Sequence, residues 1–186
     1  YRGEAPEYEN GDSIARSEMD GTPLTLEGRV VGLDGKPIPG AKIDVWQASP
    51  RGMYENQDPN QDDYNLRGVF HTDDEGRYLI RTVRPAGYPV PTHSPAGDLL
   101  RAQIRSPFRP AHVHFIVSAP DHKTLITQIF SDTMENMLND VVFGAKQQIA
   151  GDLVDNGDGT LTCTYDFTLK PGVPTFPEPP IKGKAQ

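Results

Sequence analysis

The sequence predicts a mainly β protein: a β-sandwich of mixed and antiparallel strands, with long site-forming loops and one or two short helices. Short apolar stretches with an alternating pattern recur along the chain, and turn signals separate them at short intervals. Gly and Pro number 18 each among the 186 residues, and both residue types destabilise the interior of a helix. This length suits one core, so we expect a single domain over residues 1–186.

The first strands are expected as a hairpin. The polar, acidic segment 1–23 reads as an extended arm that precedes them. From Leu24 to Trp46, apolar and polar residues alternate with the period of two of a half-buried strand. A tight-turn signal at residues 33–36 joins the two strands, and Pro37 and Pro39 then interrupt pairing.

A second hairpin is predicted after the polar loop 51–65, with strands at 69–72 and 77–83 on either side of an acidic turn. The segment 84–97 is rich in proline and glycine and must be irregular. Loops of this length are uncommon in compact domains unless they serve a site. We therefore expect functional residues in this segment.

The second half of the chain is predicted to hold three more strands, two short helices and an extended tail. The strands are expected at 112–118, 125–130 and 161–169, the helices at 98–104 and 143–149, and the proline-rich tail at 171–186. The acidic run from Asp155 to Gly159 resembles a calcium loop only faintly, because ligands are missing at the required alternation. A hairpin turn is the better interpretation of that run.

Charge and composition exclude several classes of partner. The net charge of -8 argues against a nucleic-acid or anionic-membrane partner, which would call for a basic patch. No stretch approaches the roughly 20 apolar residues of a membrane span. A single cysteine, Cys163, excludes an intramolecular disulfide, so no oxidising compartment is required and a cytoplasmic location is expected. Because the sequence begins at Tyr1 without methionine, we expect a processed or truncated chain.

The most specific local signal is the run from Arg109 to Phe115, which contains His112 and His114. In a strand, residues i and i+2 project from one face, roughly 6–7 Å apart along the backbone. Two imidazoles at this spacing can converge on one metal while Val113 packs on the other side. Two ordinary strand histidines are the alternative, so the rest of the ligand set decides between them.

Tyrosine oxygens are one possible completion of the ligand set. With one cysteine, a zinc-type thiolate set is excluded, whereas a carboxylate could still complete an Fe(II) facial triad. A phenol has a pKa near 10 in water, so only a strongly Lewis-acidic ion such as Fe(III) holds it as phenolate at neutral pH. Tyr54 and Tyr88 lie in loops without an obvious packing role, although ordinary loop tyrosines remain the alternative for each.

Several motifs between residues 1 and 151 resemble one known family. They are the segments 3–7, 35–41, 44–48, 52–54, 65–68, 85–88, 109–115 and 125–129. In this order and spacing they resemble the intradiol ring-cleavage dioxygenases, in the branch of the catechol and hydroxyquinol 1,2-dioxygenases. The Arg-Pro-Ala-His-x-His unit at residues 109–114 is close to diagnostic.

The resemblance implies a non-haem Fe(III) centre. Position by position, the iron ligands of the family fall on Tyr54, Tyr88, His112 and His114. The family pattern makes Tyr88 and His114 the axial pair. Tyr64 has no counterpart among the ligands.

The resemblance also implies the reaction and the residues that carry it. A small aromatic diol or triol would react with O2 to give a muconate-type dicarboxylic acid. Tyr88 would act as an internal base, Arg109 would stabilise negative charge on the ring, and Gln128 would face the bound ring. The segment 85–91 favours hydroxyquinol over catechol as substrate. Departures from the family at 92–94 and 103–106 bear on substrate preference rather than on iron binding.

Two further expectations concern the rest of the protein. Members of the family usually open with a helical segment that helps form the dimer, so a homodimer is expected if such a segment precedes Tyr1. A non-enzymatic prealbumin-like sandwich module is the alternative from a different class, because residues 35–41 and 76–78 also resemble such modules. These modules have no reason to combine Tyr88 and Gln128 with the run from Arg109 to Phe115.

Overall fold

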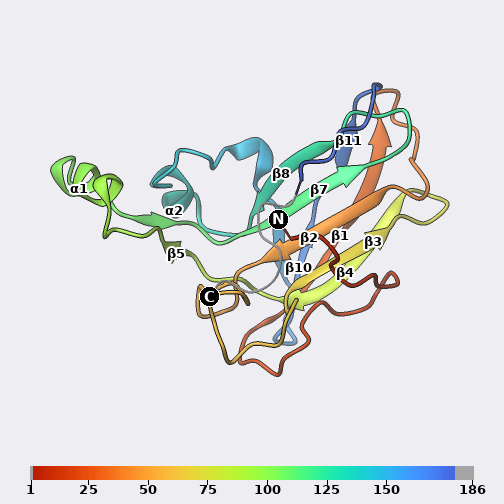
Figure 1. The fold of residues 1–186 in the computed structure, drawn as a ribbon. Coiled ribbons are helices and arrows are strands. Elements are labelled where there is room, and N and C mark those ends of the chain that lie inside the picture. Colours follow the sequence, from red (N-terminus) through yellow and green to blue (C-terminus); the bar gives the residue numbers. More distant parts are fainter. Residues whose placement is uncertain (1, 179–186) are drawn as a thin grey trace.

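Two β-sheets packed against each other form the body of the molecule (Figure 1). The computed structural model describes residues 2–178. The first sheet has the order β11-β1-β10-β9, and β4 also pairs with β1. Its strands are β1 (Pro23–Gly32), β4 (Arg77–Val83), β9 (Asp152–Asp155), β10 (Leu161–Thr164) and β11 (Phe167–Leu169).

The second sheet carries the candidate site. Its order is β3-β2-β7-β8, and all its neighbouring strands are antiparallel. Its strands are β2 (Lys42–Gln47), β3 (Arg67–His71), β7 (His112–Ser118) and β8 (Leu125–Phe130). Between the sheets, apolar side chains from both inner faces form one core, among them Leu26, Ile80, Phe167, Val45, Phe70 and Phe115. The prediction of a mainly β sandwich is confirmed.

Both predicted hairpins are wrong as pairings, although their turns are present. β1 and β2 belong to different sheets, as do β3 and β4. After the turn at residues 32–36, a single bridge joins Val31 to Pro37 before the chain crosses to the second sheet. After the turn at 73–76 the chain crosses back. Successive strands bury their apolar faces on opposite sides of the same core. A local turn signal cannot reveal which of the two sheets each strand joins.

Two strands stand where residues 161–169 predicted one. β10 and β11 both pair with β1 in parallel, and Tyr165 and Asp166 between them belong to neither strand. There Asp166 Oδ1 accepts a hydrogen bond of 2.7 Å from the Arg29 amide. A Cβ on Gly28 would lie 2.0 Å from the Tyr165 carbonyl oxygen, so only glycine permits this approach. The hairpin turn predicted at Asp155–Gly159 is confirmed, since it joins β9 to β10.

The helices only partly follow prediction. Helix α1 (Pro95–Ala102) begins after the N-cap Ser94 and confirms the first predicted helix, shifted toward the N-terminus. The second prediction, at 143–149, is wrong except for a 3-10 turn, η1 (Gln147–Ile149). A short helix that the sequence reading missed, α2 (Met134–Leu138), precedes it. The helices found between residues 2 and 178 are all too short or too polar to span a lipid bilayer.

The arm and the tail lie along the surface, but the arm also reaches the core. No strand is formed within residues 2–22. Ile14 of this arm is nevertheless fully buried in the core, which corrects the expectation of a purely peripheral segment. The tail runs without regular structure from 173 to 178, and the remainder of the predicted tail lies outside the described residues.

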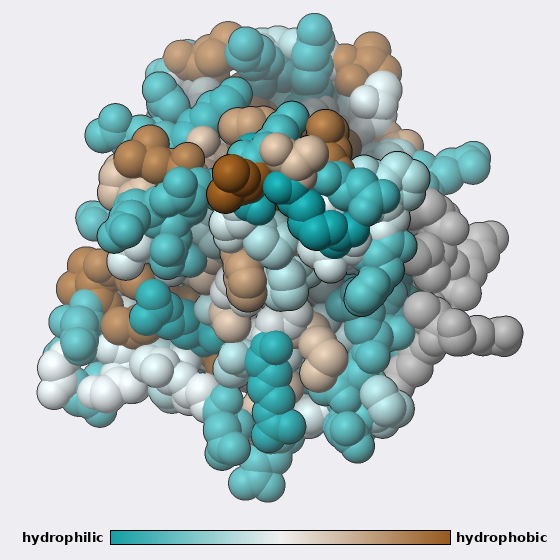
Figure 2. All heavy atoms as spheres, turned by 90° about the vertical axis from the view of Figure 1, so that its left-hand side faces the viewer, coloured by the Kyte–Doolittle hydropathy of each residue, from teal (hydrophilic) through white to brown (hydrophobic). Residues whose placement is uncertain are grey.

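A lobe to one side of the sandwich carries α1, α2 and a small ladder formed by β5 (Tyr88–Pro89) and β6 (Phe108–Arg109) (Figure 1). Figure 2 faces this side and shows apolar side chains scattered among polar ones. The exposed apolar side chains of the lobe include Leu99, Ile104, Phe108, Leu138 and Phe143. The lobe adds little to the core, and its ladder brings Tyr88 opposite Arg109.

Candidate metal centre

His112 and His114 project from the outer face of the second sheet. Both lie in β7, and Val113 between them is buried in the core on the other face. The two Nε2 atoms are 3.2 Å apart. The alternation that the sequence predicted therefore holds, and both imidazoles point into one small region.

Two tyrosines complete a ring of four donor atoms. The hydroxyl of Tyr54 lies 3.2 Å from that of Tyr88 and 3.0 Å from His114 Nε2. The hydroxyl of Tyr88 lies 3.4 Å from His112 Nε2. With the contact between the two histidines, these distances close a ring in which Tyr88 and His114 occupy opposite corners. The structure thus brings together all four residues that the sequence singled out as ligands.

Close packing of two loops makes this arrangement possible. Tyr54 follows a turn in which the amide of Gly52 donates to the Ser49 carbonyl, and Gly52 has a φ of 75°. A Cβ on Gly87 would lie 2.6 Å from the backbone oxygen of Arg109, closer than real atoms approach. Gly52 therefore lets the loop with Tyr54 approach the strand with Tyr88, and Gly87 lets that strand approach the backbone of Arg109.

The backbone fixes the tautomer of His112. Its Nδ1 lies 2.7 Å from the carbonyl oxygen of Pro110. A carbonyl only accepts, so Nδ1 must carry the proton and Nε2 presents its lone pair to the ring of donor atoms. A hydrogen bond on the distal nitrogen commonly orients a metal-binding histidine in this way.

Burial keeps both histidines neutral. It lowers the pKa of His112 from 6.5 to about 4, and the positive charge of Arg109 acts in the same direction. Burial also holds the pKa of His114 well below its ordinary value, with His112 and Arg109 adding to the effect. Neutral imidazoles are the form that binds a metal.

These shifts predict how the stability of the metal-free protein depends on pH. A histidine with a depressed folded pKa stabilises the fold above its unfolded pKa, and this contribution is lost as pH falls toward the folded pKa. When the pH falls from about 7.5 to about 5, the depressed pKa of His112 alone should lower the free energy of unfolding by about 2 kcal/mol. Urea unfolding at both pH values measures this loss, which should shrink in His112→Gln. The matched control His93→Gln changes an exposed histidine and should leave the loss intact; a pH-independent wild type would contradict the prediction.

The donor set suits a trivalent, strongly Lewis-acidic ion. Ligand atoms about 2 Å from one ion lie roughly 3 Å from one another, as these four do. Among residues 2–178, no three His, Cys, Asp or Glu side chains gather as a metal site, so a metal here needs the tyrosine oxygens. Burial raises the pKa of Tyr54 far above its ordinary value, and the neighbouring Tyr88 adds to the effect. Only a strongly polarising cation would hold that oxygen as phenolate.

Arg109 and Gln128 lie together beside the ring of donor atoms. Arg109 Nη2 donates a hydrogen bond of 2.7 Å to Gln128 Oε1, and Nη1 lies 3.3 Å from His112 Nε2. Gln128 reaches this point from β8, where its cross-strand partner is His114. Arg109 is buried, so its positive charge acts in a region poor in water. Both residues that the sequence predicted to face a substrate thus border the candidate metal centre.

Other residues of the site escaped the sequence reading. Trp46 stacks on His114 with ring centroids 4.8 Å apart and an angle of 2° between the planes. Asp140 forms a buried ion pair with Arg109. The alternation in β2 placed Trp46 on one face of a strand but not beside a histidine, and Asp140 carried no local signal. Tyr64 lies away from the site, with its hydroxyl donating to the Gly3 carbonyl.

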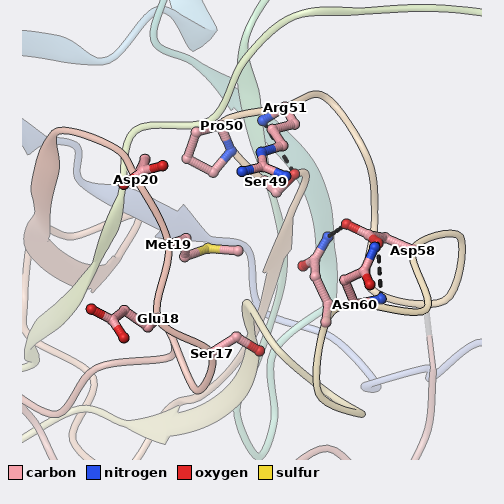
Figure 3. Close-up of a pocket in the computed structure, with 10 residues that line it drawn as sticks. Ser17, Glu18, Met19, Asp20, Ser49, Pro50, Arg51, Asp58 and Asn60 are labelled. Atoms are coloured by element: carbon pink, nitrogen blue, oxygen red, sulfur yellow. Dashed lines mark hydrogen bonds between the residues drawn. The ribbon is translucent and has the colours of Figure 1, made fainter.

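A cavity of about 310 Å³ lies elsewhere, between the arm and the loop that carries Tyr54 (Figure 3). Its lining is mainly polar and includes Glu18, Asp20, Arg51 and Asp58. None of the four ring residues lines it. Its chemistry is therefore separate from that of the candidate metal centre.

Comparison with known proteins gives a family match over most of the chain. A family model described as dioxygenase matches residues 3–171. The 6-chlorohydroxyquinol 1,2-dioxygenase of Cupriavidus pinatubonensis is 40% identical over 90% of this chain. The hydroxyquinol 1,2-dioxygenase of a Rhizobium species is 45% identical over 80% of it, and the catechol 1,2-dioxygenase of Candida albicans is 40% identical over 91%.

Solved structures agree with these matches. The hydroxyquinol 1,2-dioxygenase of Pseudomonas putida DLL-E4 superposes with a TM-score of 0.84 at 34% identity, covering 91% of this chain and 63% of that one. The catechol 1,2-dioxygenase of Pseudomonas arvilla C-1 gives 0.84 at 31% identity, covering 92% of this chain and 59% of that one. This chain spans 60%, 50% and 57% of the lengths of the three curated relatives.

Proposed function

Because the chain belongs to the intradiol ring-cleavage dioxygenase family, we propose that it cleaves a small aromatic diol or triol with O2 between the two hydroxyl-bearing carbons. The product would be a muconate-type dicarboxylic acid. The proposed cofactor is one non-haem Fe(III) ion, and residues 1–186 would form a single catalytic domain. The prediction of a homodimer, formed with an upstream helical segment, stays a prediction.

The observation that carries this proposal is the ring of two phenol oxygens and two imidazole nitrogens. Tyr54, Tyr88, His112 and His114 would hold the ion. When bound there, Fe(III) would act as a Lewis acid that stabilises phenolates and draws electron density from a chelated diol. A non-enzymatic sandwich module has no use for such a ring, so this geometry favours the enzyme over the alternative.

Tyr88 is the proposed internal base. In the loaded protein its oxygen would be a phenolate, and a substrate hydroxyl at the site would lie within reach of it. By accepting that proton, Tyr88 would let this substrate hydroxyl bind as an oxyanion. Tyr88 lies in the two-residue strand β5, which has fewer neighbours to restrain it than the central strand β7 that carries the histidines.

Arg109 and Gln128 are the proposed substrate-facing groups. The Arg109 guanidinium is held beside the donor ring by Gln128 and would stabilise negative charge that develops on the substrate ring. In a site poor in water, removing such a donor typically raises the barrier by about 2–4 kcal/mol. Gln128 would orient both the guanidinium and the ring.

Hydroxyquinol is the preferred substrate and catechol the second candidate. The segment 85–91, which contains Tyr88, resembles the hydroxyquinol branch, and two of the relatives named above act on hydroxyquinols by name. A third is named as a catechol dioxygenase. The relative kcat/KM values of the two substrates distinguish these candidates.

The visible absorption spectrum tests the proposed function directly. Iron-loaded protein should show a broad tyrosinate-to-Fe(III) band that shifts when hydroxyquinol or catechol is added without oxygen. Admitting oxygen should then consume one O2 for each substrate molecule and yield the ring-opened diacid. Protein that stays colourless after loading with Fe(III) would exclude the tyrosines as ligands and favour the sandwich-module alternative.

A further inference from the structure

The buried carboxylate of Asp140 holds the guanidinium of Arg109. Asp140 Oδ1 accepts from Arg109 Nε at 3.3 Å, and Oδ2 lies 3.5 Å from Nη2. The side chains of Asp140 and Arg109 are 1% and 9% exposed. Taking two charges out of water is costly unless they are paired and hydrogen-bonded. A pair this buried therefore requires further hydrogen bonds from the residues around it.

The backbone around Asp140 supplies those hydrogen bonds. Its Oδ2 accepts hydrogen bonds from the amides of Gly144 at 2.9 Å and Ala145 at 3.0 Å. The loop is tied to β6, because the amide of Val141 donates to the Phe108 carbonyl at 3.2 Å. Arg105 adds two hydrogen bonds to the carbonyl oxygens of Asp140 and Val141. The carboxylate is therefore fixed to the same short strand that carries Arg109.

The guanidinium contacts three groups through its three nitrogen atoms. Nε faces Asp140, Nη1 faces His112 Nε2 at 3.3 Å, and Nη2 donates to Gln128 at 2.7 Å. Of these three groups only Asp140 is both charged and anchored by backbone amides. Without Asp140, none of these groups would carry a negative charge that holds the planar guanidinium beside the donor ring.

We infer that Asp140 is a positioning residue of this site, which sets the orientation of the Arg109 guanidinium toward His112 and Gln128. This role rests on the proposed function, since Arg109 is the group that would face the substrate. Asp140 itself touches none of the four ring residues by hydrogen bond in the described part of the chain. Its effect on turnover must therefore pass through Arg109.

A double-mutant cycle between Asp140 and Arg109 tests this role. In iron-loaded protein, Asp140→Asn should lower kcat by about 10- to 100-fold while the anaerobic absorption band and the iron content stay those of the wild type. In the background of Arg109→Gln, the same change should lower kcat by less than about threefold, because residues that act as a unit are not additive. The control Asp44→Asn removes another buried carboxylate, whose ion-pair partner is Lys42, and should change neither kcat nor the band.

A second readout is independent of turnover. In protein loaded with Ga(III), a diamagnetic ion of the same charge, the Nε proton of Arg109 should exchange with water at least about tenfold faster in Asp140→Asn, since the acceptor that protects it is weakened. Asp140→Glu keeps the charge and should retain slow exchange relative to Asp140→Asn. A wild type without turnover would refute the proposed function, while the exchange measurement would still report on the orientation of Arg109.

Three outcomes would overturn the inference. The first is wild-type kcat in Asp140→Asn with its iron retained, and the second is an equal fall in both backgrounds. The third is loss of the absorption band in both Asp140→Asn and Asp140→Glu, which would make Asp140 a structural support of the metal centre instead.

Discussion

Replacing His112 by alanine is expected to abolish iron binding and with it all turnover. His112 Nε2 is one corner of the donor ring, and its tautomer is fixed by the Pro110 carbonyl. Losing a residue that merely orients a ligand costs about 10- to 100-fold in metal affinity, so losing the ligand itself should cost more than about 100-fold. Iron content after gel filtration and the visible band measure the loss. His114→Ala should behave in the same way.

A closely matched control exists for this experiment. His122 also places its Nδ1 near the carbonyl of the proline two residues before it, at 2.8 Å from Pro120. It lies in the β7–β8 connection, away from the donor ring. His122→Ala should therefore keep the iron, the band and the activity. Full iron occupancy in His112→Ala would show that the ring does not hold the metal as proposed.

Replacing Tyr88 by phenylalanine should separate iron binding from turnover. Tyr54, His112 and His114 remain in the variant, so part of the iron and a weakened, shifted band should remain. The proposed base is lost, however, and proton transfer by a positioned group contributes about 10²- to 10⁴-fold to rate. We expect kcat per bound iron to fall by at least about 100-fold, measured as oxygen uptake under saturating substrate.

Tyr64→Phe is the appropriate control for Tyr88→Phe. Tyr64 likewise uses its hydroxyl in a hydrogen bond, but that bond goes to the Gly3 carbonyl rather than to the donor ring. The activity and the visible absorption band of Tyr64→Phe should match those of the wild type. Undiminished turnover of Tyr88→Phe at full iron occupancy would remove Tyr88 from the role of base and leave it, at most, a ligand.

Local patterns in the sequence were sufficient for the longer strands and for the histidine pair. Because side chains alternate along a strand, the spacing of His112 and His114 dictates that both leave the same face of β7. The same alternation predicted the two strands between Leu24 and Trp46, which the structure forms as β1 and β2. The first helix was predicted at 98–104, and the structure moves its start to Pro95, because the Ser94 cap and a proline both favour the first turn of a helix.

Resemblance to a family, rather than spacing, pointed to the tyrosines. Tyr54 and Tyr88 are 34 residues apart and lie in a loop and a two-residue strand. Their hydroxyls meet because Gly52 lets the Tyr54 loop approach the backbone at Gly87 and Tyr88, while Gly87 lets that segment approach the backbone of Arg109. Periodicity carries no information about such an approach, so the residues alone left ordinary loop tyrosines open as an alternative.

Only the tertiary structure decided which strands pair and which charges meet. The turns at 32–36 and 73–76 read as hairpins, yet each connection crosses between sheets because the apolar faces of successive strands cover one core from opposite sides. Asp140 and Arg109 are 31 residues apart, and their pairing depends on how the loop after α2 folds onto β6. The sequence by itself determined the periodic strands and the histidine pair on β7, because these depend on neighbours along the chain. Contacts across the fold depend on the packing of the whole, which no local pattern encodes.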